Sequence, residues 1–158
     1  MATVTKKGIE QLKVHTAPYG NSWVNKYTFE TNSSGVFVDS DQTTAVIQTN
    51  VVRLGLLPAG LELYDSLSLV SGAFSGSTTC KLGWQYADGV DVTATPQADD
   101  YFSASVATNA QGRYLANNLA SRPVKLPKDA YLIITVAGAD HASVGVMDVI
   151  VRGDFKGV

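Results

Sequence analysis

The chain has 158 residues, enough for one domain that buries its own core without disulfides or metal ions. Only 16% of the residues are charged, the formal net charge is −2 and no run of Lys or Arg occurs, so the clustered cations that nucleic-acid phosphates require are missing. No stretch approaches the roughly 20 apolar residues of a membrane span, and the N-terminus lacks the apolar segment of a signal peptide. We therefore expect cytoplasmic synthesis without a signal peptide, no nucleic-acid partner and no membrane partner.

Residues 1–22 are polar and show neither the helical nor the strand period, which predicts an extended N-terminal arm before a single β domain over 23–158. The first expected strand is Lys26 to Thr31. A turn at Asn32-Ser33-Ser34-Gly35 follows, because these residue types tolerate left-handed or side-chain-capped backbone. Two further extended stretches are expected at 36–38 and, bent near Thr49-Asn50, at 43–56.

The clearest pattern in the sequence lies at residues 57–70. Leu57-Pro58-Ala59-Gly60 suits a type I turn with Pro second and Gly fourth. In the following strand, apolar residues stand at 61, 63, 67 and 69, while Glu62, Tyr64, Ser66 and Ser68 occupy the alternate positions. A period of two indicates a half-buried strand, so the leucines are expected to face the core and the polar set to face solvent.

After a Gly/Ser loop at 71–77, the alternation of Cys80, Leu82, Trp84 and Tyr86 predicts a strand whose cysteine and tryptophan are buried. With a two-residue turn at Asp88-Gly89, the apolar residues of this strand would not lie opposite the apolar residues of 90–94. A three-residue loop, 87–89, instead pairs Tyr86 with Val90, and it requires Gly89 in a left-handed conformation at a bulge.

The remaining chain contains the most β-prone sequences. Residues 96–123 are irregular, and both a helical turn from Asp100 to Phe102 and an alternating strand there fit the pattern. Residues 114–119 form a short element of open type. Residues 131–136 and 144–152 are the two most β-prone runs, and both are apolar on both faces over part of their length, as in central or interface strands. Short strands with turn signals between them predict an all-β fold, an antiparallel β-sandwich of the jelly-roll kind.

No constellation of catalytic or metal-binding residues stands out. His15 and His141 lack metal-ligand spacing, and a catalytic His141 would have to meet a distant Asp and Ser. Three acidic pairs, 39/41, 88/91 and 99/100, carry oxygen ligands that suit Ca²⁺, but turn formation and capping account for Asp at such places. We therefore predict no catalytic residue, no cofactor, no metal ion and no enzymatic activity.

Candidate partner-contact residues are the apolar and aromatic groups in segments without a periodic core. Trp23 fits a core position and a contact position equally well, and we place it with the contact residues. The predicted set is Val14, His15, Tyr19, Trp23, Tyr101 and Phe102.

The order of motifs over residues 43–152 resembles a known group of proteins. The motifs are Leu57-Pro58-Ala59-Gly60, a Leu/Val strand, a Gly/Ser loop, Thr79-Cys80-Lys81-Leu82-Gly83-Trp84, Asp99-Asp100-Tyr101-Phe102, Leu126-Pro127-Lys128-Asp129-Ala130 and Val144 to Val151. They are similar to those of small virion proteins of tailed bacteriophages, the head decoration or cement proteins, which have a jelly-roll sandwich.

This resemblance implies a structural role on a capsid surface. It implies the major capsid protein and further copies of the chain, often three, as partners, with the protein locking neighbouring capsid subunits together. The predicted arm, extended, reaches roughly 60 Å, enough to touch a neighbouring subunit. The alternative function is a glycan-binding β-sandwich of a phage tail or fibre, for which exposed Trp or Tyr side chains on one concave face would be the signature.

Overall fold

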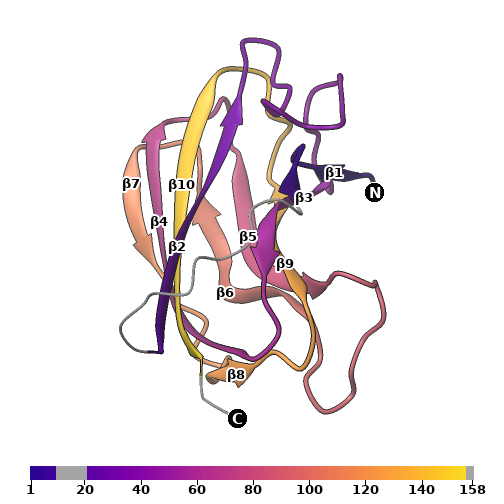
Figure 1. Ribbon diagram of the computed structural model, residues 1–158. Coiled ribbons are helices and arrows are strands. Elements are labelled where there is room, and N and C mark those ends of the chain that lie inside the picture. The colour runs from indigo at the N-terminus through magenta and orange to yellow at the C-terminus, as the bar shows by residue number, and fades with distance from the viewer. Residues whose placement is uncertain (10–20, 156–158) are drawn as a thin grey trace.

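The computed structural model describes residues 1–9 and 21–155 and arranges them as two packed β-sheets (Figure 1). Within those residues no helix is long and apolar enough to cross a membrane. The strands are β1 (Thr3–Thr5), β2 (Ser22–Thr31), β3 (Val51–Leu57), β4 (Leu61–Gly72), β5 (Thr79–Tyr86), β6 (Ala98–Ala107), β7 (Gly112–Leu115), β8 (Val124–Lys125), β9 (Ala130–Ala137) and β10 (Gly145–Phe155).

The strand order is that of a rolled-up antiparallel ribbon. The β9 sheet has the order β1-β3-β9-β5-β6, and the β10 sheet has the order β2-β10-β4-β7, with β8 also paired to β4. Four antiparallel pairs are nested in the sequence: β5 with β6, β4 with β7, β3 with β9 and β2 with β10. Rolling such a ribbon into two layers gives a jelly roll. The predicted all-β sandwich is thereby confirmed.

The core lies between the two sheets and contains the residues that the alternation placed there. Trp84 and Cys80 are each 1% exposed, as predicted, and burial raises the pKa of the Cys80 thiol to about 12. The Tyr27 hydroxyl on β2 donates to the carbonyl oxygen of Leu56 on β3 at 2.8 Å, which ties the two sheets together.

Residues 3–5 are part of the sandwich, which corrects this part of the predicted arm at 1–22. β1 pairs in parallel with β3, with Val4 opposite Val52, and the Val4 side chain is completely buried. Three residues are too short for a period to be visible in the sequence. β2 already begins at Ser22, and residues 10–20 of the predicted arm lie outside the described residues.

The alternation in β4 changes phase halfway along the strand. Leu63 pairs with Gly153 and Asp65 with Arg152, so Tyr64 is an extra residue in a β-bulge. Beyond it Ser66 and Ser68 are each 1% exposed, while Leu67 and Leu69 are half-buried on the other face. The prediction for Leu61 and Leu63 holds, but the predicted faces of residues 66–69 are wrong because a bulge shifts the period of two by one residue.

The hairpin after β5 was only half predicted. Gly89 has a φ of 73° and its N–H donates to the Tyr86 carbonyl at 3.2 Å, which confirms the left-handed glycine. The pairing with 90–94 is wrong, because β5 pairs with β6 instead, with Trp84 opposite Ala98. The side chain of Asp91 accepts from the Gln97 N–H at 2.8 Å and holds 91–97 as a loop.

Four other local predictions differ in outcome. The turn at 32–35 is confirmed, since Gly35 has a φ of 74° and donates to the Asn32 carbonyl at 2.9 Å. The bend near 49–50 is confirmed by a φ of 73° at Thr49, but 43–50 contains no strand. The turn before β4 spans 58–61, and Gly60, with a φ of 84° at its third position, is typical of type II instead of type I. Residues 100–102 belong to a strand.

Candidate interaction surface

The structure separates the predicted contact residues. Val14, His15 and Tyr19 lie outside the described residues. Trp23, Tyr101 and Phe102 are 3%, 8% and 1% exposed, so the expectation that they have no core to bury them is wrong. Trp23 occupies an inward position of β2, and Tyr101 and Phe102 belong to β6, whose outer side is covered by residues 116–122. A partner contact of Tyr101 and Phe102 stays a prediction, because both line a hollow that is open to solvent.

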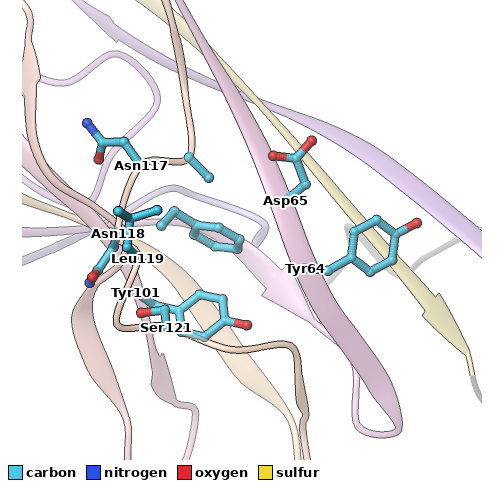
Figure 2. Close-up of a pocket in the computed structure, with 9 residues that line it drawn as sticks. Tyr64, Asp65, Tyr101, Asn117, Asn118, Leu119 and Ser121 are labelled. Atoms are coloured by element: carbon cyan, nitrogen blue, oxygen red, sulfur yellow. The ribbon is translucent and has the colours of Figure 1, made fainter.

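This hollow has a volume of about 260 Å³ and lies between β4 and the segment after β7. Figure 2 shows Tyr64 and Asp65 of β4 on one side and Asn117, Asn118 and Leu119 on the other. The complete lining is Tyr64, Asp65, Tyr101, Phe102, Ala116, Asn117, Asn118, Leu119 and Ser121. The sequence analysis missed this hollow, because the bulge at Tyr64 and the path of 116–121 are both long-range features.

Residues 116–121 are held in place by bonds to both sheets. The Ala116 N–H donates to the Ser66 carbonyl of β4 at 3.0 Å, and the Asn117 N–H donates to the Phe102 carbonyl of β6 at 2.9 Å. The Asn118 side-chain amide donates to another β6 carbonyl, that of Asp100, at 2.8 Å. The segment therefore closes the side of the sandwich between β4 and β6, and it presents Leu119 with 99% of its side chain exposed.

At the base of the hollow, the Tyr101 hydroxyl forms hydrogen bonds with backbone carbonyl groups. The Tyr101 hydroxyl lies 2.9 Å from the Leu63 carbonyl oxygen and 2.8 Å from that of Arg122. Burial raises the pKa of Tyr101 to about 12, with a smaller contribution from the negative charge of Glu62, so the hydroxyl is a neutral donor at physiological pH. At the rim, the Tyr64 hydroxyl lies 3.4 Å from an Asp154 carboxylate oxygen.

The outer face of the β10 sheet carries apolar residues beside the hollow. Because residues paired across antiparallel strands share a face, Leu67 of β4, Ile150 of β10 and Leu115 of β7 form one row. Leu69 lies in the next row, and Val24 of β2 stands in the row beyond Ile150. We call these five residues, Val24, Leu67, Leu69, Leu115 and Ile150, the outer apolar face.

Charged residues stand between the apolar residues of this face, and four of them form ion pairs. Lys26 of β2 lies 3.6 Å from Asp148 of β10, and Arg152 of β10 lies 3.4 Å from Asp65 of β4. Each pair joins neighbouring strands of the same sheet, so a large part of the charge here is balanced within the chain. Partly exposed pairs of this kind contribute little to stability, on the order of 0–1 kcal/mol each. Their main effect is that opposite charges cancel locally, so this surface has no strong electrostatic field.

His141 is buried in a setting that does not suit acid–base catalysis. Its side chain is completely buried, and neither ring nitrogen has a hydrogen-bond partner among the described residues. The ring packs edge-on against Phe74 and Phe29, at centroid distances of 4.6 and 5.4 Å. Desolvation lowers the pKa of His141 to about 4, although the charge of Asp140 acts in the opposite direction. The imidazole is therefore neutral at physiological pH and packs as an apolar ring.

Asp88 has the turn role that the sequence favoured, because its carboxylate accepts from the Val90 N–H at 3.0 Å. Asp41 and Asp99 instead contact distant parts of the chain. Asp41 accepts from the Thr5 N–H at 2.8 Å, and Asp88 also forms an ion pair with Lys128 at 2.7 Å. The hydrogen bonds from Lys128 lower the pKa of Asp88. Asp99 pairs with Lys81 at 3.1 Å. Across residues 1–9 and 21–155, no cluster of three or more His, Cys, Asp or Glu side chains is placed to hold a metal ion.

Comparison with known proteins finds similarity in structure alone. No family model matches the sequence, and no curated protein matches it. A chain of the capsid of Ralstonia phage GP4 superposes with a TM-score of 0.68 at 16% identity, covering 99% of this chain and 100% of that chain. A chain of the acid-stable capsid of Helicobacter pylori bacteriophage KHP30 has a TM-score of 0.52 at 16% identity, with coverages of 90% and 92%.

A chain from the capsid asymmetric unit of cyanophage Pam1 is also similar. Its TM-score is 0.53 at 13% identity, and the match covers 93% of this chain and 96% of that chain. At these identities the three likenesses show a shared fold. The match to the Ralstonia phage chain extends over the whole length of both chains, so the shared fold includes the N-terminal strand as well as the sandwich.

Proposed function

We propose that this protein is a structural component of a phage virion, which decorates the capsid surface and stabilises it by bridging capsid subunits. The observation that carries the proposal is the full-length structural likeness to a chain of a phage capsid, with two further phage capsids among the similar structures. The motif resemblance to head decoration proteins leads to the same function. The major capsid protein and further copies of this chain, in a symmetric oligomer such as a trimer, are the proposed partners.

The surface chemistry is consistent with a protein that binds through shape and apolar contact. Leu119, Leu115 and Tyr64 are 99%, 65% and 44% exposed and come from neighbouring parts of the β4–β7–β8 region. Exposed apolar groups gathered in one region are typical of protein–protein contacts. Leu119 is also held by a segment that is hydrogen-bonded to both sheets, so little ordering entropy would be lost when it docks.

The decisive test is the amount of this chain in gradient-purified particles, measured by quantitative mass spectrometry. Hundreds of copies per particle, comparable to the major shell protein, are expected. A handful of copies would place the chain in the tail and overturn the decoration role. Absence from particles would overturn the virion role altogether.

We propose that residues 10–20 contribute to attachment through Val14, His15 and Tyr19. Because β1 belongs to the sandwich, deleting the whole N-terminus would damage the fold as well as any contact. Replacing the three side chains with serine leaves β1 intact. We expect this variant to keep the melting temperature of the wild type and to bind particles more weakly, and unchanged binding would contradict the contact.

Glycan binding is the second candidate function, and the hollow beside Tyr64 favours it. An exposed tyrosine ring next to Asp65, Asn117 and Ser121 combines a stacking surface with polar groups, as saccharide sites do. Titration of the protein with a panel of neutral oligosaccharides, monitored by NMR, tests this function. Shifts confined to the hollow that disappear in Tyr64→Ala but persist in Val90→Ala, a distant exposed apolar site, would support it. No shift at millimolar sugar would exclude it.

A further inference from the structure

The two outer faces of the sandwich differ in how their apolar residues are covered. On the β9 sheet, Tyr131 and Ile133 are 8% and 3% exposed and form a small cluster with Ile9 and Val51. On the β10 sheet, Leu115 and Val24 are 65% and 61% exposed, and Leu67, Leu69 and Ile150 are half-buried. The fold thus buries the outer apolar residues of one sheet and leaves those of the other partly or largely exposed.

The uncovered residues are exposed by a specific feature of β4. Without the bulge at Tyr64, the period of two would put Leu67 and Leu69 in the core and Ser66 and Ser68 outside. With the bulge, both serines are 1% exposed and both leucines lie on the outer surface. This arrangement leaves apolar area on the surface and so gives up part of the burial that would stabilise an isolated monomer. It becomes favourable where a partner covers the leucines.

The charges around this face indicate which partner fits. A surface with a strong net field would repel a second copy of itself and require an oppositely charged partner. Here the Lys26–Asp148 and Arg152–Asp65 pairs balance charge inside the sheet. Arg113 of β7, opposite Leu69, is also exposed on this face, so a second copy can stack only in an orientation that keeps the two Arg113 side chains apart.

The dimensions of the sheet also suit a contact between copies. Three strands of about ten residues, spaced about 4.8 Å apart with a rise of about 3.3 Å per residue, cover roughly 500 Å² of plane. Two such faces stacked as in a β-sandwich bury on the order of 1,000 Å², close to the lower limit for a specific interface. Contacts of this size are typical of weak and transient association.

We infer that the outer apolar face of the β10 sheet binds a second copy of this chain, sheet against sheet. Leu67, Leu115 and Ile150 form one row of the contact, with Lys26 at its β2 end, and the Asp148 and Arg152 side chains stand in the rows on either side. The contact uses the same face of both copies, so it joins them in pairs about a two-fold axis. It deepens the proposed virion role by naming a surface through which copies associate in addition to the symmetric oligomer proposed above. Its tests use the purified protein without particles, so the contact and the virion role can fail independently.

Analytical ultracentrifugation of the purified full chain from 1 to 200 µM is the first test. The wild type is expected to associate over this range. Leu115→Ser is expected to raise the dissociation constant at least tenfold, and Val90→Ser, which also removes an exposed apolar side chain, is expected to leave it unchanged. A monomeric wild type at 200 µM, or equal association of both variants, would overturn the inference.

Cysteine accessibility gives a second test that leaves Leu67, Leu115 and Ile150 unchanged. Val24→Cys and Val90→Cys place single exposed thiols on and off the face, while Cys80 stays buried. The maleimide reaction at position 24 should slow at least fivefold from 1 to 200 µM protein, and the reaction at position 90 should not change. A reaction at position 24 that does not slow over this range would overturn the copy contact.

Discussion

Acidification should destabilise the fold through His141. The unfolded chain takes up a proton at this histidine near its ordinary pKa of 6.5, but burial lowers the pKa in the folded protein to about 4. Above pH 6.5 the histidine is neutral in both states and makes no difference to stability. As the pH falls towards 4, only the unfolded state is protonated, so stability is lost across this window.

The size of the effect follows from the difference between the two pKa values. A difference of about 2.5 units corresponds to about 3 kcal/mol of unfolding free energy, fully lost below about pH 4. For a domain of this length that lowers the melting temperature by roughly 6 to 12 °C. The physical cause is desolvation of the buried imidazole, which packs against Phe74 and Phe29 and has no hydrogen-bond partner among the described residues to offset it.

Urea unfolding at pH 7 and at pH 4 measures this contribution, with His141→Leu as the matched control. Each protein is compared with itself at the two pH values, so the packing change in the variant cancels. The wild type should lose about 3 kcal/mol more than His141→Leu over this interval. Equal losses in the two proteins, or a His141 titration midpoint above 6 by NMR, would refute the reasoning.

Three further substitutions and one thiol reaction test local features. Gly35→Ala should destabilise the protein by more than 3 kcal/mol, because the φ of 74° is strained for alanine and the new Cβ would overlap the His141 carbonyl oxygen. Gly60→Ala, with a φ of 84° but no atom within 4 Å, should cost only about 1 kcal/mol, and equal effects in urea unfolding would contradict this. Val4→Ala should cost about 2 kcal/mol by the same assay, since the side chain is completely buried, and a neutral result would show that β1 does not dock. The Cys80 thiol should react with Ellman's reagent only at the rate of unfolding, and fast reaction at pH 8 without urea would contradict its burial.

The sequence by itself determined the features that depend on neighbouring residues. Alternation placed Trp84 and Cys80 in the core, because successive side chains of a strand leave opposite faces whatever the strand pairs with. The left-handed conformations of Gly35 and Gly89 were equally predictable, since a local turn requires them. The same local signals identified an all-β sandwich and the strong central strands β9 and β10.

Which side chains are exposed on the surface of the proposed contacts depends on the pairing of strands that are distant in the sequence. The bulge at Tyr64 depends on the register between β4 and β10, and it reverses the faces of Leu67 and Leu69 although their sequence pattern is regular. The burial of Val4 depends on β3, and that of Tyr101 depends on a segment that follows it by about fifteen residues or more. Each of these outcomes depends on which distant strand supplies the partner hydrogen bonds, and the order of residues within a single strand contains no information about that choice.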